Sequence, residues 1–248
     1  MYNKCLISAY HFSLCLVMSP LTCRSRMQTL GSALSRTVLL VSNAAKAISN
    51  PDDGAAVAAV GELTAIRSAG TMLSAMLEDK DGRYLLRQRP RISDDTLKYA
   101  ETLQVGTVGK AYAVYMQENG FLPSGRAPIR FIEDENLSYV VCRYREVHDF
   151  LHVITGCDRT VLGELALKGF EYSQSGIPLG LLSIAGGAPH LTTAQRHHLT
   201  SKLLPWAADH RVGGPLGSRF FLNVVWEDEL STPLDDLRRR LSWKCVPE

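Results

Sequence analysis

The chain has 248 residues, of which 46% are hydrophobic and 21% charged, and its formal net charge at pH 7 is +2. This length and balance are those of a globular protein with one domain or at most two. The first 51 residues hold five basic residues and no acidic one, which leaves 22 of the 27 basic residues against 25 acidic ones. The body of the chain therefore has no basic excess, which argues against a nucleic-acid partner.

The N-terminal segment, Met1 to about Arg36, is rich in serine, contains arginine and lacks acidic residues. This composition predicts a mitochondrial transit peptide over residues 1–36, followed by a helical domain over residues 37–248. The alternative is a secretory signal with an apolar core from Cys5 to Val17, although basic residues follow that core. The apolar run is short and interrupted at Pro20, which argues against a membrane-spanning helix.

Residues 28–79 are rich in alanine, leucine, valine and serine, and the turn residues of Asn50–Gly54 divide them into two predicted helical stretches. The segment Arg83–Pro90 is expected to be a short basic connector that ends at Pro90. A further helix is predicted to begin at Ser93, whose hydroxyl can cap it. Another is predicted over Thr107–Asn119, closed by the glycine that follows.

The next predicted helix carries apolar residues at alternating spacings of three and four, which predicts a buried face. These residues are Leu137, Val140, Tyr144, Val147, Leu151 and Ile154. His148 and His152 lie four residues apart, so their side chains stand one above the other at the edge of that face. Asp149 lies about 100° further round the helix, so it can join the two histidines only from the side.

The chain then breaks at Thr155–Asp158, and a second helix is predicted from Thr160 to Gln174, which brings Glu164 back towards the histidines. Imidazole and carboxylate groups bind zinc and similar metals at about 2 Å. The pattern therefore predicts a metal site held by two successive helices, in which a catalytic ion would keep one position for water or substrate.

A solvated helix edge without a metal is the alternative. In that case Asp149 pairs with Arg145 and Glu164 pairs with Lys168, both at a spacing of four residues. The six cysteines form no CxxC pair, so a structural zinc knot is not expected and a reducing compartment suits the chain. Cys157 lies close to the predicted site, where packing as a free thiol is favoured over ligation.

The C-terminal third begins with an apolar run, residues 176–191, that contains no Asp, Glu, Lys or Arg. Core packing, the wall of an apolar tunnel and contact with a bilayer are all open for it. A helix is predicted over Thr192–Ala208, and Ser218–Trp226 is expected to be a short strand or the start of a helix. A last helix is predicted to open at Ser231–Pro233.

The metal pattern His148-Asp149-x-x-His152, followed after eleven residues by Glu164, resembles that of the mitochondrial ubiquinone (coenzyme Q) biosynthesis proteins. The resemblance covers about residues 80–242 and departs from the family in the loop Cys157–Thr160. The other matching positions are Asp95–Tyr99, Gly106–Gly109, Tyr112, Tyr115, Asn119, Arg143–Glu146, Leu162–Glu164, Lys168, Glu171, Gly176–Pro178 and Leu204–Ala207.

This resemblance implies an all-α fold and a carboxy-lyase that removes the C1 carboxylate of a 4-hydroxy-3-methoxy-5-polyprenylbenzoate, giving a 2-methoxy-6-polyprenylphenol. It also implies His148, Asp149, His152 and Glu164 as ligands of Zn²⁺, with Fe²⁺ or Mn²⁺ as alternatives if oxidation accompanies decarboxylation. Glu171, seven residues after Glu164 on the same helix face, is a candidate catalytic or supporting group.

The implied location is the matrix side of the mitochondrial inner membrane, as a peripheral protein in a complex with other ubiquinone-biosynthesis enzymes. The rival hypothesis is a non-catalytic, lipid-binding scaffold that organises those enzymes around a structural zinc. An HD-type phosphohydrolase is a weaker hypothesis, because that chemistry needs a further upstream histidine and the earlier His11 lies within the leader.

Overall fold

The computed structural model describes the backbone of residues 20–50 and 53–248, and side chains from Leu34 onward apart from residues 51–52. The chain divides into two compact units, residues 1–39 and 40–248. The described part of the first unit is helical and belongs to α1 (Pro20–Ser49). Residues 1–19 of the predicted leader lie outside the described residues, so the transit peptide remains a prediction.

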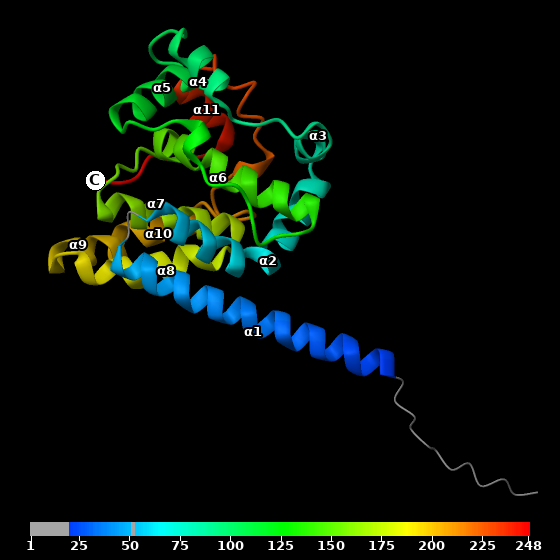
Figure 1. Cartoon of the computed structure of the whole chain (residues 1–248). Coiled ribbons are helices and arrows are strands. Elements are labelled where there is room, and N and C mark those ends of the chain that lie inside the picture. Colours follow the sequence, from blue (N-terminus) through cyan, green and yellow to red (C-terminus); the bar gives the residue numbers. More distant parts are fainter. Residues whose placement is uncertain (1–19, 51–52) are drawn as a thin grey trace, which may run out of the picture. The chain divides into compact units, whose positions relative to one another are not determined.

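The second unit consists of α-helices joined mostly by short turns, with longer connecting segments before α6 (residues 119–134) and before α11 (residues 210–233) (Figure 1). They are α2 (Gly54–Glu78), α3 (Lys80–Gln88), α4 (Asp94–Glu101), α5 (Val108–Glu118), α6 (Glu135–Thr155), α7 (Val161–Ser175), α8 (Pro178–Gly187), α9 (Thr193–His198), α10 (Leu204–Asp209) and α11 (Leu234–Leu241). Single 3₁₀ turns form at Pro123–Gly125, Ala188–His190 and Phe221–Asn223, and a π-helical turn at Leu199–Leu203 joins α9 to α10. Across the described ranges no strand forms, so the predicted all-α fold is confirmed.

Local capping chemistry sets several of these helix boundaries where the sequence predicts them. The Ser93 hydroxyl accepts the backbone N–H of Thr96 at the start of α4, and Thr107 does the same for Lys110 at the start of α5. A side-chain cap of this kind stabilises a helix by about 1 kcal/mol, because it satisfies a backbone donor that has no partner inside the helix.

Helix α6 is the central element of the second unit. In Figure 1 it lies between a group made of α4, α5 and α11 and a group made of α7, α8 and α10. The Phe150 ring stacks on Tyr112 of α5, with ring centroids 4.0 Å apart, and on Trp226 at 5.1 Å. All three side chains are fully buried, and burying a Phe-sized side chain contributes about 1.5–3 kcal/mol.

Four consecutive residues of α6, Arg143–Glu146, each attach the helix to a different segment. Their ion-pair or hydrogen-bond partners are Glu227 for Arg143, Glu171 for Tyr144, Glu62 for Arg145 and Arg91 for Glu146. Residues next to each other on a helix point about 100° apart, so four neighbours can reach four directions. The helix that carries both histidines is therefore held in place from all sides.

Two predictions along the chain are wrong. Arg83–Pro90 is not a connector, because α3 occupies Lys80–Gln88 with Leu85 buried and Asp79 capping its first turn. Gly82 makes this tight junction possible, since a Cβ there would lie 2.3 Å from the Met76 carbonyl oxygen. Ser218–Trp226 is neither a short strand nor the start of an α-helix, and it contains a single 3₁₀ turn, Phe221–Asn223.

The apolar run over residues 176–191 forms α8 and the 3₁₀ turn that follows it. Leu181 and Leu182 are about half exposed, at 48% and 49%, so the run is not simply core. Within the described residues, no helix combines the length and the hydropathy that crossing a bilayer would require.

Candidate metal centre

The two predicted histidine ligands lie on adjacent turns near the end of α6. The helix stops at Gly156, whose backbone takes the left-handed conformation with φ of 75° and donates its N–H to the carbonyl oxygen of His152. A residue with a Cβ would be strained there, so glycine suits a sharp helix end. His148 and His152 therefore sit one turn apart beside the turn that leads into α7.

That turn brings Glu164 back to the histidines. Thr160 caps α7 by accepting the Gly163 N–H, and Asp158 accepts the backbone N–H and the hydroxyl of Thr160. Gly163 packs against Asp158 so closely that a Cβ would lie 2.1 Å from its Oδ1. Glu164 is consequently fixed in the first turn of α7, facing α6.

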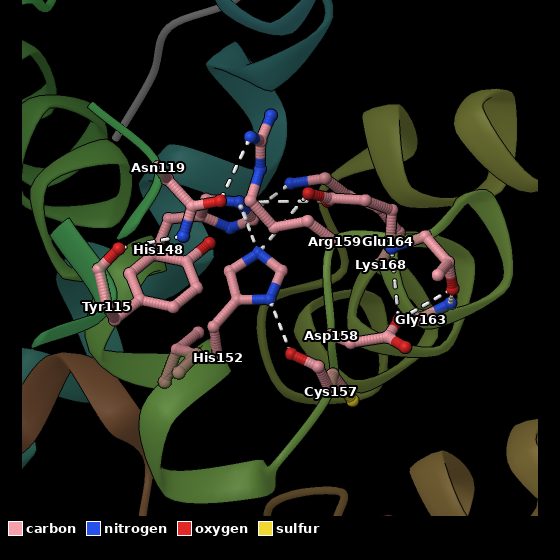
Figure 2. A network of polar contacts seen from close by, with 12 residues as sticks. Tyr115, Asn119, His148, His152, Cys157, Asp158, Arg159, Gly163, Glu164 and Lys168 are labelled. Carbon is pink, nitrogen blue, oxygen red and sulfur yellow. Dashed lines mark hydrogen bonds and ion pairs between the residues drawn. The ribbon is translucent and has the colours of Figure 1, made fainter. Parts of the chain in front are cut away.

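The ligand atoms of His148, His152 and Glu164 converge, as Figure 2 shows, and all lie within 4.8 Å of one another. The two Nε2 atoms are 3.2 Å apart, Glu164 Oε1 lies 3.3 Å from His152 Nε2, and Glu164 Oε2 lies 3.9 Å from His148 Nε2. Two ligands at about 2 Å from a tetrahedral zinc ion are separated by about 3.3 Å. The spacing of these donor atoms therefore fits a single ion, as the sequence predicts.

The outer nitrogen of each imidazole is held by an acceptor. His152 Nδ1 donates to the Cys157 carbonyl oxygen at 2.8 Å, and His148 Nδ1 donates to Glu171 Oε1 at 2.6 Å. In the neutral imidazole with Nδ1 protonated, Nε2 keeps its lone pair, and in that state both lone pairs face Glu164. Two lone pairs and a carboxylate pointing at one spot repel each other unless a cation lies between them. This donor set fits a divalent metal, with the outer hydrogen bonds that histidine ligands commonly have.

Glu171 lies behind His148 and is fully buried. Its carboxylate accepts hydrogen bonds from the Tyr144 hydroxyl at 2.6 Å and the Lys168 ammonium at 2.7 Å, in addition to that from His148. Burial alone would raise the pKa of Glu171, but the charges of Lys168 and His148 and their hydrogen bonds hold that pKa well below its ordinary value. The residue is thus an ionised acceptor that orients a histidine.

Glu164 is also held in its ionised form. Burial would raise the pKa of its carboxyl, but when no metal is bound and the imidazoles are protonated, the hydrogen bond from His152 and the charges of His148, His152 and Lys168 lower the pKa to about 2. A carboxylate that stays deprotonated at neutral pH is the form that binds a metal.

Asp149 does not join the three other predicted ligands. Its carboxylate is ion-paired with Arg126, from the loop between α5 and α6, and it is absent from the converging group found among the described residues. Its position about 100° round the helix turns it away from the shared focus of the two histidines. The alternative of a metal-free helix edge predicted ion pairs of Arg145 with Asp149 and of Lys168 with Glu164. Instead, Arg145 contacts Glu62 and Lys168 contacts Glu171.

The remaining wall of the site comes from α5. The Tyr115 ring stacks on the His152 imidazole, with centroids 5.1 Å apart. Burial, together with the charges of Asp149 and Glu164, raises the pKa of Tyr115, so its hydroxyl stays protonated. The chain position of Tyr115, 37 residues before His152, gives no sign of this contact, because it depends on how α5 packs against α6.

Comparison with known proteins identifies a family. The sequence profile of the family described as Coenzyme Q (ubiquinone) biosynthesis protein Coq4 matches residues 26–247. The mitochondrial ubiquinone biosynthesis protein COQ4 homolog of Trypanosoma brucei brucei is 39% identical over 211 residues, which cover 84% of each chain. The Aspergillus fumigatus protein of the same name is 41% identical over 216 residues, covering 86% of this chain and 74% of the relative.

The Leishmania infantum homologue is 44% identical over 170 residues, covering 67% of this chain and 90% of the relative. The fold is similar to the crystal structure of a Nostoc punctiforme protein assigned to ubiquinone biosynthesis, with a TM-score of 0.63 at 19% identity over 84% of this chain and 96% of that one. The resemblance read from the metal pattern is therefore confirmed, and the chain belongs to the Coq4 family of ubiquinone biosynthesis proteins, whose curated relatives are named mitochondrial.

Proposed function

We propose that the protein is a metal-dependent carboxy-lyase of ubiquinone biosynthesis. Its substrate would be a 4-hydroxy-3-methoxy-5-polyprenylbenzoate and its product a 2-methoxy-6-polyprenylphenol. The observation that carries this proposal is the number of ligands. Three protein groups converge while Asp149 is held by Arg126. Catalytic zinc sites have three protein ligands and an open position, whereas structural sites have four protein ligands.

The same observation weighs against the rival, a non-catalytic scaffold built around a structural zinc. A scaffold needs a closed site, and the fourth ligand that would close it, Asp149, is ion-paired elsewhere. Family membership supports a role in the ubiquinone pathway for either hypothesis. The open position supports the enzyme.

The reaction transfers one proton and is not a redox step. C1 of the ring gains a proton, the bond from C1 to the carboxylate carbon breaks, carbon dioxide leaves and the electron pair returns to the ring. A divalent ion at this site would supply a Lewis acid that binds the carboxylate or a phenolic oxygen of the substrate and so orients the ring. His148, His152 and Glu164 would hold that ion, and Tyr115 forms the wall of the site beside His152.

Glu171 enters this proposal as a positioning residue. Three donors occupy its carboxylate and its side chain is 1% exposed, so it has no free path to a substrate. It fixes the tautomer and the direction of His148. The proton that C1 gains must then come from solvent or from another group at the open side of the site.

Zinc is the metal that we propose first, because two imidazoles and a carboxylate suit it. Zinc has no redox chemistry, so hydroxylation of C1 coupled to decarboxylation would need dioxygen and Fe²⁺ or Mn²⁺ in the same ligands. We place the enzyme at the matrix side of the inner membrane as a peripheral protein in contact with other ubiquinone-biosynthesis enzymes. In this proposal residues 1–36 are the import signal and residues 37–248 the mature domain.

The test uses protein purified without added metal. Its metal content is measured, and it is then incubated with the prenylated hydroxybenzoate with and without oxygen. Glu164→Ala removes the one carboxylate ligand, so we expect it to abolish both bound metal and decarboxylation. Retention of either would overturn the proposed function. If product forms only in the presence of oxygen and only with protein that contains iron or manganese, the reaction is decarboxylation coupled to hydroxylation of C1, and not simple decarboxylation.

A further inference from the structure

Arg159 lies in the turn between α6 and α7 at the edge of the metal-ligand group (Figure 2). Two residues earlier, the Cys157 carbonyl oxygen accepts the hydrogen bond from His152. One residue later, Thr160 caps the helix that carries Glu164. The backbone on either side of Arg159 is therefore fixed by the same contacts that position two of the ligands.

The guanidinium of Arg159 is anchored although the residue is exposed. Its Nη1 donates to Asn119 Oδ1 at 3.2 Å, and its Cζ lies 4.5 Å from the centroid of the Phe121 ring. Asn119 in turn donates to the carbonyl oxygen of Tyr115, whose ring stacks on His152. A continuous set of contacts thus leads from the guanidinium to a metal ligand. A cation over an aromatic ring is attracted by the negative face of the ring, which favours one orientation of the guanidinium.

Charge distinguishes Arg159 from the other basic side chains near the site. Each of these contacts a carboxylate: Arg126 with Asp149, Arg143 with Glu227, Arg145 with Glu62 and Lys168 with Glu171. Across the described part of the chain, Arg159 contacts no carboxylate within ion-pair distance. The adjacent Asp158 accepts from Thr160 instead.

We propose that Arg159 binds the carboxylate of the aromatic acid and thereby determines the preference of the site for an anion. This inference rests on the proposed function, since it assigns the residue that recognises the group to be removed. A guanidinium presents its donors in a planar fork that matches a carboxylate, and charge-assisted hydrogen bonds of this kind are about twice as strong as neutral ones. The product lacks the carboxylate, so its release loses no contact with Arg159.

Binding can test this inference separately from turnover. The probes are 4-hydroxy-3-methoxy-5-geranylbenzoate and its uncharged methyl ester, each titrated calorimetrically into the metal-free full chain, which cannot turn the acid over, while the metal content of each variant is measured on separate samples. The variants are Arg159→Gln, which removes the charge, and Arg159→Lys, which keeps the charge without the fork. Arg130→Gln is the matched control, because Arg130 is also an exposed arginine over an aromatic ring, 5.4 Å from the centroid of Phe131.

We expect Arg159→Gln to weaken binding of the acid about 10- to 100-fold, the loss typical of charge-assisted hydrogen bonds, while binding of the ester and metal content stay unchanged. Arg159→Lys should recover part of the affinity, and Arg130→Gln should resemble the parent protein. Equal losses for acid and ester, or a loss of metal, would reveal a structural role and overturn the inference. If the parent prefers the acid and Arg159→Gln keeps that preference, only this inference fails. If the parent binds neither probe, the proposed substrate fails with it.

Discussion

The contact between Glu171 and His148 allows a quantitative prediction, with Glu171→Gln as the perturbation. The substitution keeps the shape of the side chain but removes the charge that accepts from His148 Nδ1 at 2.6 Å and from Lys168 Nζ at 2.7 Å. Lys168 is largely buried, with 15% of its side chain exposed, so its ammonium would lose the carboxylate that it contacts. Removing one partner of a buried ion pair costs about 3–5 kcal/mol.

A second effect should appear in metal binding. Loss of the outer hydrogen-bond partner of a histidine ligand weakens metal affinity by about 10- to 100-fold. The assays are urea unfolding of the metal-free protein and competition of the folded protein with a zinc chelator. We therefore expect both a lower free energy of unfolding without metal and a weaker affinity for zinc.

Glu227→Gln is the matched control. Glu227 pairs with the fully buried Arg143 on the same helix, at 2.5 and 2.8 Å, but its contacts do not reach the metal ligands. It should lower the free energy of unfolding to a similar extent and leave zinc affinity unchanged. If both variants weaken zinc binding equally, the loss reflects general destabilisation of α6, and the role assigned to Glu171 is refuted.

Two further predictions concern the turn before Glu164 and a buried histidine. Gly163→Ala should weaken metal binding, because the added Cβ would lie 2.1 Å from Asp158 Oδ1. The matched control is Gly70→Ala, which lies in open space within α2 and should raise the free energy of unfolding by about 1 kcal/mol without changing metal affinity. Equal metal affinity in the two variants would contradict this account. Burial, together with the charge of Lys244, lowers the pKa of His210 despite the hydrogen bond to the Trp206 carbonyl oxygen and the charge of Asp209. The unfolded chain then binds more protons just below the ordinary histidine pKa of about 6.5, so the free energy of unfolding falls as the pH drops through that value. Urea titrations at pH 7 and below pH 6 should show that the free energy of unfolding decreases less for His210→Gln than for the parent protein. An identical decrease would show that His210 does not contribute to this pH dependence.

The elements predicted correctly from sequence are those governed by local chemistry. Ser93, Thr107 and Thr160 cap α4, α5 and α7 through hydrogen bonds that span three residues, so each signal is complete within a short window. The failed prediction for residues 83–90 has the opposite cause. Three arginines made this segment look like a basic connector. The helix α3 that forms there is stabilised by the buried Leu85 and by the close approach of Gly82 to α2, which are tertiary contacts.

The candidate site divides in the same way. His148 and His152 share a face because of helical periodicity, and a short turn brings Glu164 to them, so this group was predictable. The hydrogen-bond and ion-pair partners of Asp149 and Glu171 were less predictable from the sequence. Arg126 comes from a separate loop, and Tyr144 reaches Glu171 across the interface between two helices.

The amino-acid sequence alone thus determined most helix boundaries and the group of two histidines and one glutamate, because each depends on residues close together in the chain, whereas the all-α class followed from the family resemblance. Tertiary packing alone decided that Asp149 pairs with Arg126, that Tyr115 covers His152 and that Arg159 stays without a carboxylate partner in the described part of the chain. These three features depend on segments that come together only when α5, α6 and α7 pack around a common core. The number of ligands left for a metal ion, and hence the choice between a catalytic and a structural site, depends on that assembly.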